Sequence, residues 1–218
     1  MSFAVEHFSA LTNLTGVAHG FATRVPGIDV TQDKADARAR LDHAHRELRA
    51  ARGLGRAPFV TSQQVHGNQI AIIDEPITAD KCFAGCDGLI TNQRSVCLGI
   101  YVADCCAVFL VDPKRQVIGL VHSGKKGTEL EIVSNAIRAM TQRFGSLASD
   151  LIVQLSPCIR PPHYEIDFAA KIVQQCRELG VVELHDCGVC TACDLDRYYS
   201  YRAEKGRTGR MLAFCALA

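Results

Sequence analysis

The sequence has no tryptophan, and aromatic residues make up only 6% of its 218 positions. It also has no excess of either charge: 24 basic and 23 acidic side chains leave a formal net charge of +1. Proteins that bind nucleic acid or anionic membranes through electrostatics carry a clustered basic excess. The charge balance therefore predicts neither nucleic acid nor a membrane surface as a partner.

Long hydrophobic runs are absent as well. Asp104 and Asp112 interrupt the longest apolar stretches, which stay far below the ~20 residues of a membrane-spanning helix. The opening MSFAVEHFSA lacks a basic segment followed by an apolar one, so we expect no signal peptide. Eleven cysteines without a secretion signal predict reduced thiols in the cytoplasm. The length predicts one domain over residues 1–218.

The most informative stretch is residues 96–128. Two apolar runs, 106–111 and 116–121, flank the turn 112–115, whose second residue is proline, as in a type I turn. Both faces of both runs are apolar, which predicts a hairpin buried between two layers. With a symmetric four-residue loop, paired positions sum to 227, and Cys105 lies directly opposite His122.

Helices are predicted at three places: over residues 31–52, from the capping box at 128–131, and after the helix cap Asp167. On the first helix we expect both His43 and His45 at the surface, because positions i and i+2 do not share a face. Apolar or alternating runs predict strands at 14–24, 59–65, 69–73, 86–91, 151–155 and 211–217. This mixture of helices and strand runs indicates an α+β fold, with a sheet packed on another sheet or on helices.

His66, Cys105 and His122 form a candidate mononuclear metal site. Three protein ligands that leave one position open are typical of catalytic zinc, which lowers the pKa of its bound water to about 7. The same residues allow a second interpretation, in which Cys105 is a nucleophile and His122 its base. The two interpretations compete, because a thiolate bound to metal is a poor nucleophile.

Two other cysteine or histidine patterns are weaker. Cys187, Cys190 and Cys193 are spaced C-x2-C-x2-C, but Arg197 stands where a ferredoxin motif needs its fourth cysteine. A three-thiolate zinc site and incidental thiols both remain open there. A multicopper centre needs several paired imidazoles, and the one His-x-His motif, at 43–45, lies on a charged helix. We therefore reject a multicopper oxidase.

Basic residues in turn-rich loops form a candidate anion clamp. The segment 123–127 precedes the helix expected after the capping box, and free N–H groups at a helix N-terminus favour anions. An ordinary solvated surface is the alternative. The basic residues concerned are Arg24, Lys125, Lys126, Arg202 and Arg210.

Short motifs along nearly the whole chain resemble the YfiH-like laccase-domain family, whose members are better described as purine nucleoside phosphorylases. The matching motifs are HGFATR at 19–24, QVHG at 64–67, CDGLIT at 86–91, ADC at 103–105, HSG at 122–124, YE at 164–165, SYR at 200–202 and TGRML at 208–212. The resemblance implies an α+β layered sandwich with two mixed β-sheets between helical layers. It also implies a Zn²⁺ ion held by His66, Cys105 and His122.

The activities that the resemblance implies are phosphorolysis of adenosine, inosine, guanosine and methylthioadenosine, and hydrolytic deamination of adenosine. In the deamination, a water activated by zinc would attack the purine at C6. We expect purine nucleoside and phosphate as ligands; the oligomeric state stays open. The expected substrate-binding residues are Arg24, Asp87, Lys125, Lys126 and Arg202.

The chain departs from the family pattern around the substrate. Lys125-Lys126-Gly127 replaces the usual Trp-Arg-Gly, which removes an aromatic platform and the bidentate guanidinium. Pro162-His163 replaces a usual Cys-Cys pair. The metal ligands are thus intact while the substrate contacts are altered. The alternatives to a phosphorylase are a cysteine-dependent amide hydrolase and a divergent zinc-binding protein with reduced catalysis.

Overall fold

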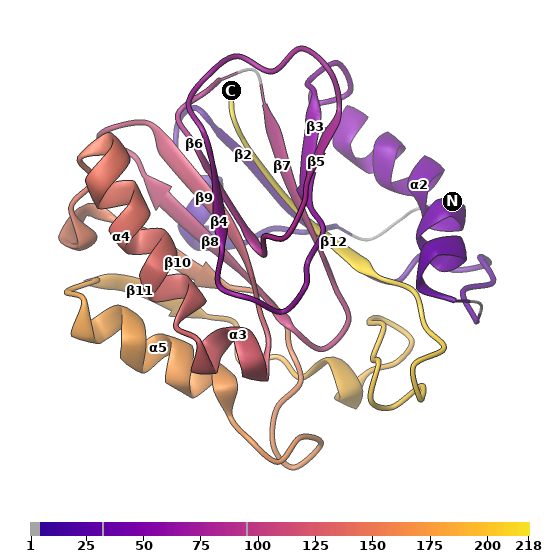
Figure 1. Ribbon diagram of the computed structural model, residues 1–218. Helices are drawn as coiled ribbons and strands as arrows, with labels where there is room; N and C mark the ends of the chain where they lie inside the picture. Colours follow the sequence, from indigo (N-terminus) through magenta and orange to yellow (C-terminus); the bar gives the residue numbers. More distant parts are fainter. Residues whose placement is uncertain (1–4, 32, 95) are drawn as a thin grey trace.

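A computed structural model describes residues 5–31, 33–94 and 96–218 (Figure 1). Gln32, inside the helix expected over 31–52, lies outside the described residues. Among the described residues, no helix combines the length and apolarity needed to span a membrane. A single domain over 1–218 and a cytoplasmic location stay predictions.

The architecture consists of two six-stranded mixed sheets. The strands of the first sheet are, in spatial order, β1 (Val5–Glu6), β2 (Val17–Ala22), β12 (Met211–Leu217), β7 (Cys97–Val102), β3 (Phe59–Ser62) and β5 (Lys81–Phe83). Those of the second sheet are β11 (Glu183–Asp186), β10 (Ile152–Leu155), β8 (Cys106–Asp112), β9 (Val117–Ser123), β6 (Gly88–Thr91) and β4 (Ile70–Ile73). The helices are α1 (Ser9–Thr12), α2 (Lys34–Ala50), α3 (Lys125–Glu129), α4 (Ile132–Phe144) and α5 (Phe168–Glu178), with 3₁₀ turns at Ala148–Asp150 and Thr191–Cys193.

The two sheets pack face to face between helical layers, as the resemblance implied. Phe109 and the other odd-numbered residues of β8 join the core between the sheets. Val108 and the even-numbered residues pack instead against α4 and α5, which cover the outer face of the second sheet. The helix α2 covers the outer face of the first sheet (Figure 1). Both faces of β8 and β9 are buried, which confirms the predicted buried hairpin.

The hairpin register differs from the prediction. Ala107, not Cys105, pairs with His122, and Asp112 pairs with Val117, so the loop is 113–116. The side chain of Asp112 explains the shift, because its Oδ1 accepts hydrogen bonds from the N–H groups of residues 114 and 115, both at 3.0 Å. Asp112 therefore ends the strand rather than starting the turn. A shift of two in the pairing sum keeps every side chain on its predicted face.

The predicted capping box at 128–131 is wrong. Residues 125–129 already form the short helix α3, and α4 begins after Glu131, which has a left-handed φ of 57° and no side-chain cap. The Thr128 hydroxyl instead shares a hydrogen bond of 2.8 Å with the hydroxyl of Ser123. Segment 123–127 thus contains a helical turn rather than being a loop that leads into a long helix. The prediction at Asp167 is confirmed, since its carboxylate caps α5 by accepting from Ala170 N.

The prediction that His43 and His45 both lie at the surface holds for His43 and is wrong for His45. The His45 ring is 1% exposed, and both of its nitrogens are buried without a hydrogen-bond partner. It packs beside the ring of Tyr101 from β7, with Arg38 and Arg49 of its own helix as the nearby charges. Burial and these two guanidinium groups lower the pKa of His45 to about 3.

This environment predicts a loss of stability in acid. The unfolded chain binds a proton at His45 near pH 6.5 and the folded chain does not, so the free energy of unfolding falls as the pH drops below 6.5. Between pH 7.5 and pH 5 the loss from this one group is about 2 kcal/mol. We expect His45→Leu to lack this part of the pH dependence in urea unfolding at the two pH values. His43→Leu, on the exposed side of α2, should keep the wild-type dependence, and an unchanged slope in His45→Leu would contradict the assignment.

Candidate active site

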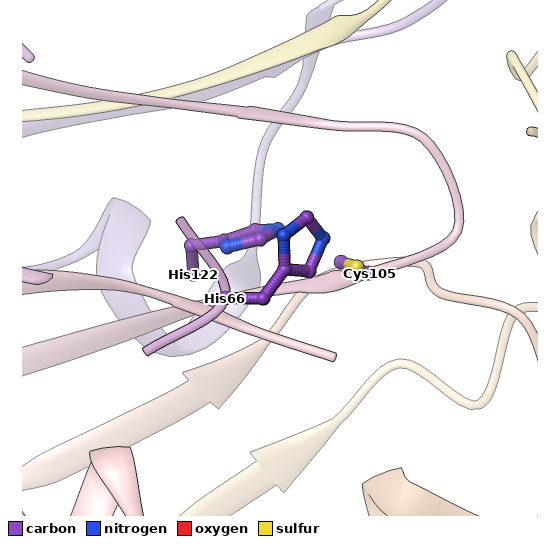
Figure 2. Close-up of side chains that lie close together, drawn as sticks. All are labelled: His66, Cys105 and His122. Carbon is purple, nitrogen blue, oxygen red and sulfur yellow. The ribbon is translucent and has the colours of Figure 1, made fainter. Parts of the chain in front are cut away.

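Three side chains from distant parts of the chain meet at one end of the space between the sheets (Figure 2). His66 lies on the segment that crosses from β3 in the first sheet to β4 in the second. Cys105 lies on the bend that crosses from β7 to β8, and His122 lies in β9. Their candidate ligand atoms all fall within 4.8 Å of one another, and the two imidazole centroids are 4.9 Å apart.

Both crossing segments use backbone conformations that are uncommon outside glycine. Gln64 and His66 have φ values of 60° and 59°, and Asp104, just before Cys105, has 82°. Gln64 stabilises its turn through its side-chain amide, which donates to Tyr101 O at 2.6 Å and accepts from Tyr101 N at 3.0 Å. These two bonds replace the backbone pairing that ends with β3. Such strained positions cost energy and occur preferentially at functional sites.

A buried carboxylate, Asp87, connects two of the three side chains. Its oxygens accept hydrogen bonds from the backbone N–H groups of Val65, His66 and Gly67 at 2.8–3.1 Å. The same carboxylate accepts from Nδ1 of His122 at 2.8 Å. A proton held at Nδ1 leaves Nε2 of His122 as the nitrogen available to a ligand. Asp87 therefore fixes both the turn that carries His66 and the orientation of the His122 ring.

The electrostatics of the cluster favour a charged thiolate. Burial alone would raise the pKa of Cys105, but His122 and His66 outweigh it and lower that pKa to about 6. Burial would likewise lower the pKa of His122, and the Cys105 thiolate together with Asp87 raises it to about 9. Burial also acts to raise the pKa of Asp87, yet its hydrogen bonds lower it overall. The protein thus stabilises a thiolate beside an imidazolium, and a metal ion that takes the place of the imidazolium proton finds the sulfur already in the ionised form that it requires.

A glycine makes room for the sulfur. A Cβ atom built on Gly124 would lie 2.5 Å from Sγ of Cys105. Position 124 follows β9, so the sulfur sits above the end of the strand that carries His122. The two imidazoles and the thiolate fit a borderline-soft divalent ion such as zinc, whose usual ligands are these groups.

A cavity of about 500 Å³ opens onto the cluster, a volume typical of small-molecule sites. Its polar wall includes the cations Lys125, Arg202 and Arg210. The other residues that line it are Gln64, His66, Tyr101, Ala103, Asp104, Cys105, His122, Gly124, Ile159, Tyr164, Phe168 and Tyr201. The site thus combines a possible metal centre, aromatic surfaces and positive charge.

Known proteins share the sequence pattern and the fold of this chain. The profile of the family described as multi-copper polyphenol oxidoreductase laccase matches residues 11–171 and 163–218. The chain belongs to this laccase-domain family. A relative from Streptomyces griseus, named purine nucleoside phosphorylase ORF3, is 31% identical, with 96% of this chain and 98% of that protein aligned. One from Clostridium acetobutylicum, purine nucleoside phosphorylase CA_C1699, is 31% identical over 70% of this chain and 74% of its own.

Solved structures of the family show the same fold. YlmD from Geobacillus stearothermophilus superposes with a TM-score of 0.81 at 23% identity, covering 94% of this chain and 93% of its own. YfiH from Bacillus licheniformis gives a TM-score of 0.83 at 21% identity, covering 94% of each chain. The α+β sandwich of two mixed sheets between helical layers, which the resemblance implied, is thereby confirmed.

The structure brings only some of the expected substrate residues of this laccase-domain protein to the cavity. Lys125 and Arg202 line it, whereas Arg24, Asp87 and Lys126 are not among its lining residues. Arg24 donates to the carbonyl of Tyr198 and pairs with Glu204 at 2.8 Å, so it braces the loop that carries Arg202. Asp87 lies fully buried behind the cluster. Both act on neighbours of the cavity rather than inside it.

Sequence reasoning did not single out the aromatic wall. Tyr164 and Phe168 pack edge to face at 5.9 Å, and the Arg202 guanidinium lies 4.7 Å above the Tyr164 ring. Tyr164 belongs to the YE motif, but Phe168 lies in α5, where an aromatic residue normally indicates core packing. The lining role of Phe168 carries no signal in the sequence alone, because it depends on how the segment before α5 folds over the cluster.

The role of Asp87 predicts that Asp87→Asn weakens metal binding. An amide has one acceptor oxygen and turns its NH₂ group toward backbone donors, so neither the His66 turn nor the His122 ring stays fixed. We expect zinc affinity to fall roughly 10- to 100-fold, measured by competition with a chromophoric chelator. Asp42→Asn, which removes a surface carboxylate paired with Arg46, is the control and should bind as wild type. Equal affinity in Asp87→Asn would contradict this positioning role.

A methyl group at position 124 should displace the thiolate. In Gly124→Ala the new Cβ cannot coexist with Sγ of Cys105 at 2.5 Å, so the sulfur must leave its position. We expect markedly weaker zinc binding with a melting temperature close to that of wild type. Gly127→Ala lies three residues later, inside α3, where the nearest neighbour of the new Cβ would be 3.4 Å away, and it should bind zinc normally. If both variants bind alike, the close packing at Gly124 has no functional role.

Proposed function

We propose that this protein is a metal-dependent purine nucleoside phosphorylase that uses zinc at His66, Cys105 and His122. The observation that carries the proposal is the three-ligand cluster at the floor of a cationic, aromatic cavity. Relatives named purine nucleoside phosphorylase share 31% identity with this chain. Bound zinc would act as a Lewis acid and lower the pKa of water in its open position.

The residues of the cavity fall into two groups, one suited to phosphate and one suited to the purine of the nucleoside. Lys125 and Arg202 supply positive charge for the phosphate anion, with Arg210 deeper in the wall. Tyr164, Phe168 and Tyr201 offer ring faces on which a purine can stack. The aromatic surface of this cavity thus comes from other segments than position 125, where the family usually carries tryptophan.

Deamination of adenosine is a finer part of the same proposal. It requires a water placed against C6 of the purine and a cavity that admits the base toward the cluster. The preferred nucleoside among adenosine, inosine, guanosine and methylthioadenosine depends on contacts around the base. We propose adenosine and inosine as first substrates to test. Phosphorolysis of adenosine releases adenine, whereas hypoxanthine appears from adenosine only after deamination to inosine, so the two bases distinguish the two reactions.

A cysteine-dependent amide hydrolase is the second candidate, and one observation favours it. The environment of Cys105 lowers its pKa, and His122 lies beside it, as in a thiolate activated for covalent catalysis. That activity would persist in metal-free protein, need no phosphate and disappear when Cys105 is alkylated. A zinc-binding protein without turnover would bind nucleoside and release no base.

The decisive experiment is a nucleoside panel assayed with and without phosphate on zinc-loaded protein. We expect release of free base only when phosphate is present, and loss of activity in His66→Ala because one metal ligand is missing. Lys125→Ala should raise the KM for phosphate roughly 10-fold or more, since a hydrogen bond to a charged group is removed. Base and nucleoside are quantified by chromatography.

The matched control for the lysine is its neighbour. Lys126→Ala removes the same charge one residue away, outside the cavity lining, and should leave the KM for phosphate near wild type. Base release without phosphate, or in metal-free protein, would contradict the proposal and favour the hydrolase. No release from any nucleoside, with nucleoside still raising the melting temperature, would favour a binding protein.

A further inference from the structure

The proposed active site does not use the C-x2-C-x2-C run. In the fold, a histidine lies beside this run and joins two of its cysteines. Cys190 precedes the 3₁₀ turn Thr191–Cys193 and Cys193 ends it, and the segment before α5 brings His163 beside Cys193. Sγ of Cys193 lies 3.7 Å from Nε2 of His163. Cys187, the first cysteine of the run, packs instead against the core between the sheets. We call His163, Cys190 and Cys193 the rim cluster.

We propose that the rim cluster is a second metal site, for a thiophilic divalent cation such as zinc. Two ligands of one tetrahedral zinc, with bonds of about 2.3 Å to sulfur and 2.0 Å to nitrogen, lie about 3.6 Å apart. The contact between Cys193 and His163 matches this spacing. The C-x2-C pair is the usual zinc-chelating arrangement of two thiolates on one short turn.

The surroundings of the two thiols agree with a cation. A hydrogen bond with the Cys190 thiol raises the pKa of Cys193, and repulsion between two adjacent thiolates adds to the shift. A divalent ion removes this repulsion, and it displaces the thiol protons when it binds. A reactive redox cysteine shows the opposite shift, toward a lower pKa. Cys193 is exposed and Cys190 is half-buried, so a metal ion can reach the pair from solvent.

The rim cluster is partly assembled. Among the described residues, the 4.8 Å mutual spacing is met by His66, Cys105 and His122 and not by the rim cluster, so its third ligand must move inward. His163 and Cys193 are exposed, which leaves their side chains free to rotate. The backbone of Cys190 is fixed by its bridge to Cys158, and Thr191 N donates to Cys158 O at 3.2 Å. A metal ion would thus be held by side chains that can rotate, next to a turn whose backbone is fixed.

The position of the rim cluster gives the ion a structural role at the cavity. The hydroxyl of Thr191, between the two cysteines, donates to Oδ1 of Asp104 at 2.7 Å, and Asp104 precedes Cys105. Tyr164, which follows His163, lines the cavity. A metal at the rim cluster would tie together the two segments that carry these residues. This role does not depend on which reaction the cavity performs.

Zinc stoichiometry tests the proposal without an activity assay. Reduced full-length protein is stripped, loaded with excess zinc, dialysed against metal-free buffer and analysed for bound metal. We expect two zinc ions per chain in wild type, one in Cys193→Ser and one in Cys105→Ser. Cys187→Ser is the matched control within the same run and should keep two. A single ion in wild type that persists in Cys193→Ser, or two ions in Cys193→Ser, would overturn the second site.

Cobalt gives an independent signature of the ligands. In the Cys105→Ser background the proposed active site has lost its thiolate ligand, so a thiolate-to-cobalt absorption band is expected there from the rim cluster. The band should disappear on adding Cys190→Ser or Cys193→Ser, weaken with His163→Ala and persist with Cys187→Ser. Melting temperatures of the metal-free variants check that each one folds. Absence of the band from the folded Cys105→Ser protein would exclude the rim cluster as a metal site, whether or not the protein phosphorolyses nucleosides.

Discussion

The buried carboxylate of Asp87 provides the interactions on which the geometry of the candidate active site depends. A buried charge is tolerated only when hydrogen bonds replace its lost hydration, and four donors do so here. Three of these donors belong to the turn around His66 and one to the ring of His122. The distance between the two imidazoles is therefore set by one group, which itself sits at the start of β6.

The location of the site follows from how the chain passes between its two sheets. Both His66 and Cys105 lie on segments that leave one sheet and enter the other, and these segments must turn sharply at the open end of the core. The left-handed residues Gln64, His66 and Asp104 make these turns. Their strain is held by specific bonds, such as the amide of Gln64 to Tyr101 and the carboxylate of Asp104 to Thr191. The segments that cross between the two sheets thus form the candidate site.

The sequence predicted the buried elements well because their signals are local. Alternation along β8 placed Phe109 and Val108 on opposite buried faces, which the structure confirms. Predictions failed where a single side chain altered the position of a turn or the width of a packed face. The carboxylate of Asp112 moved the hairpin loop by one residue. His45 is buried because its ring packs beside Tyr101, which Arg38 also covers, so the packed face of α2 extends beyond its few apolar residues.

The candidate metal ligands could be found from sequence, whereas the cavity wall could not, and the difference is physical. A wrong hairpin register still placed Cys105 near His122, because a shift of two keeps the face, and Gly124 then admits the sulfur from the adjacent position. The wall, in contrast, depends on loops that far-apart contacts hold in place. Arg24 binds the carbonyl of Tyr198, and Arg202 N donates to Asp104 at 2.7 Å. A cation can thus serve the cavity from inside, as Arg202 does, or from behind it by bracing a loop, as Arg24 does. Residue type alone cannot distinguish these two roles.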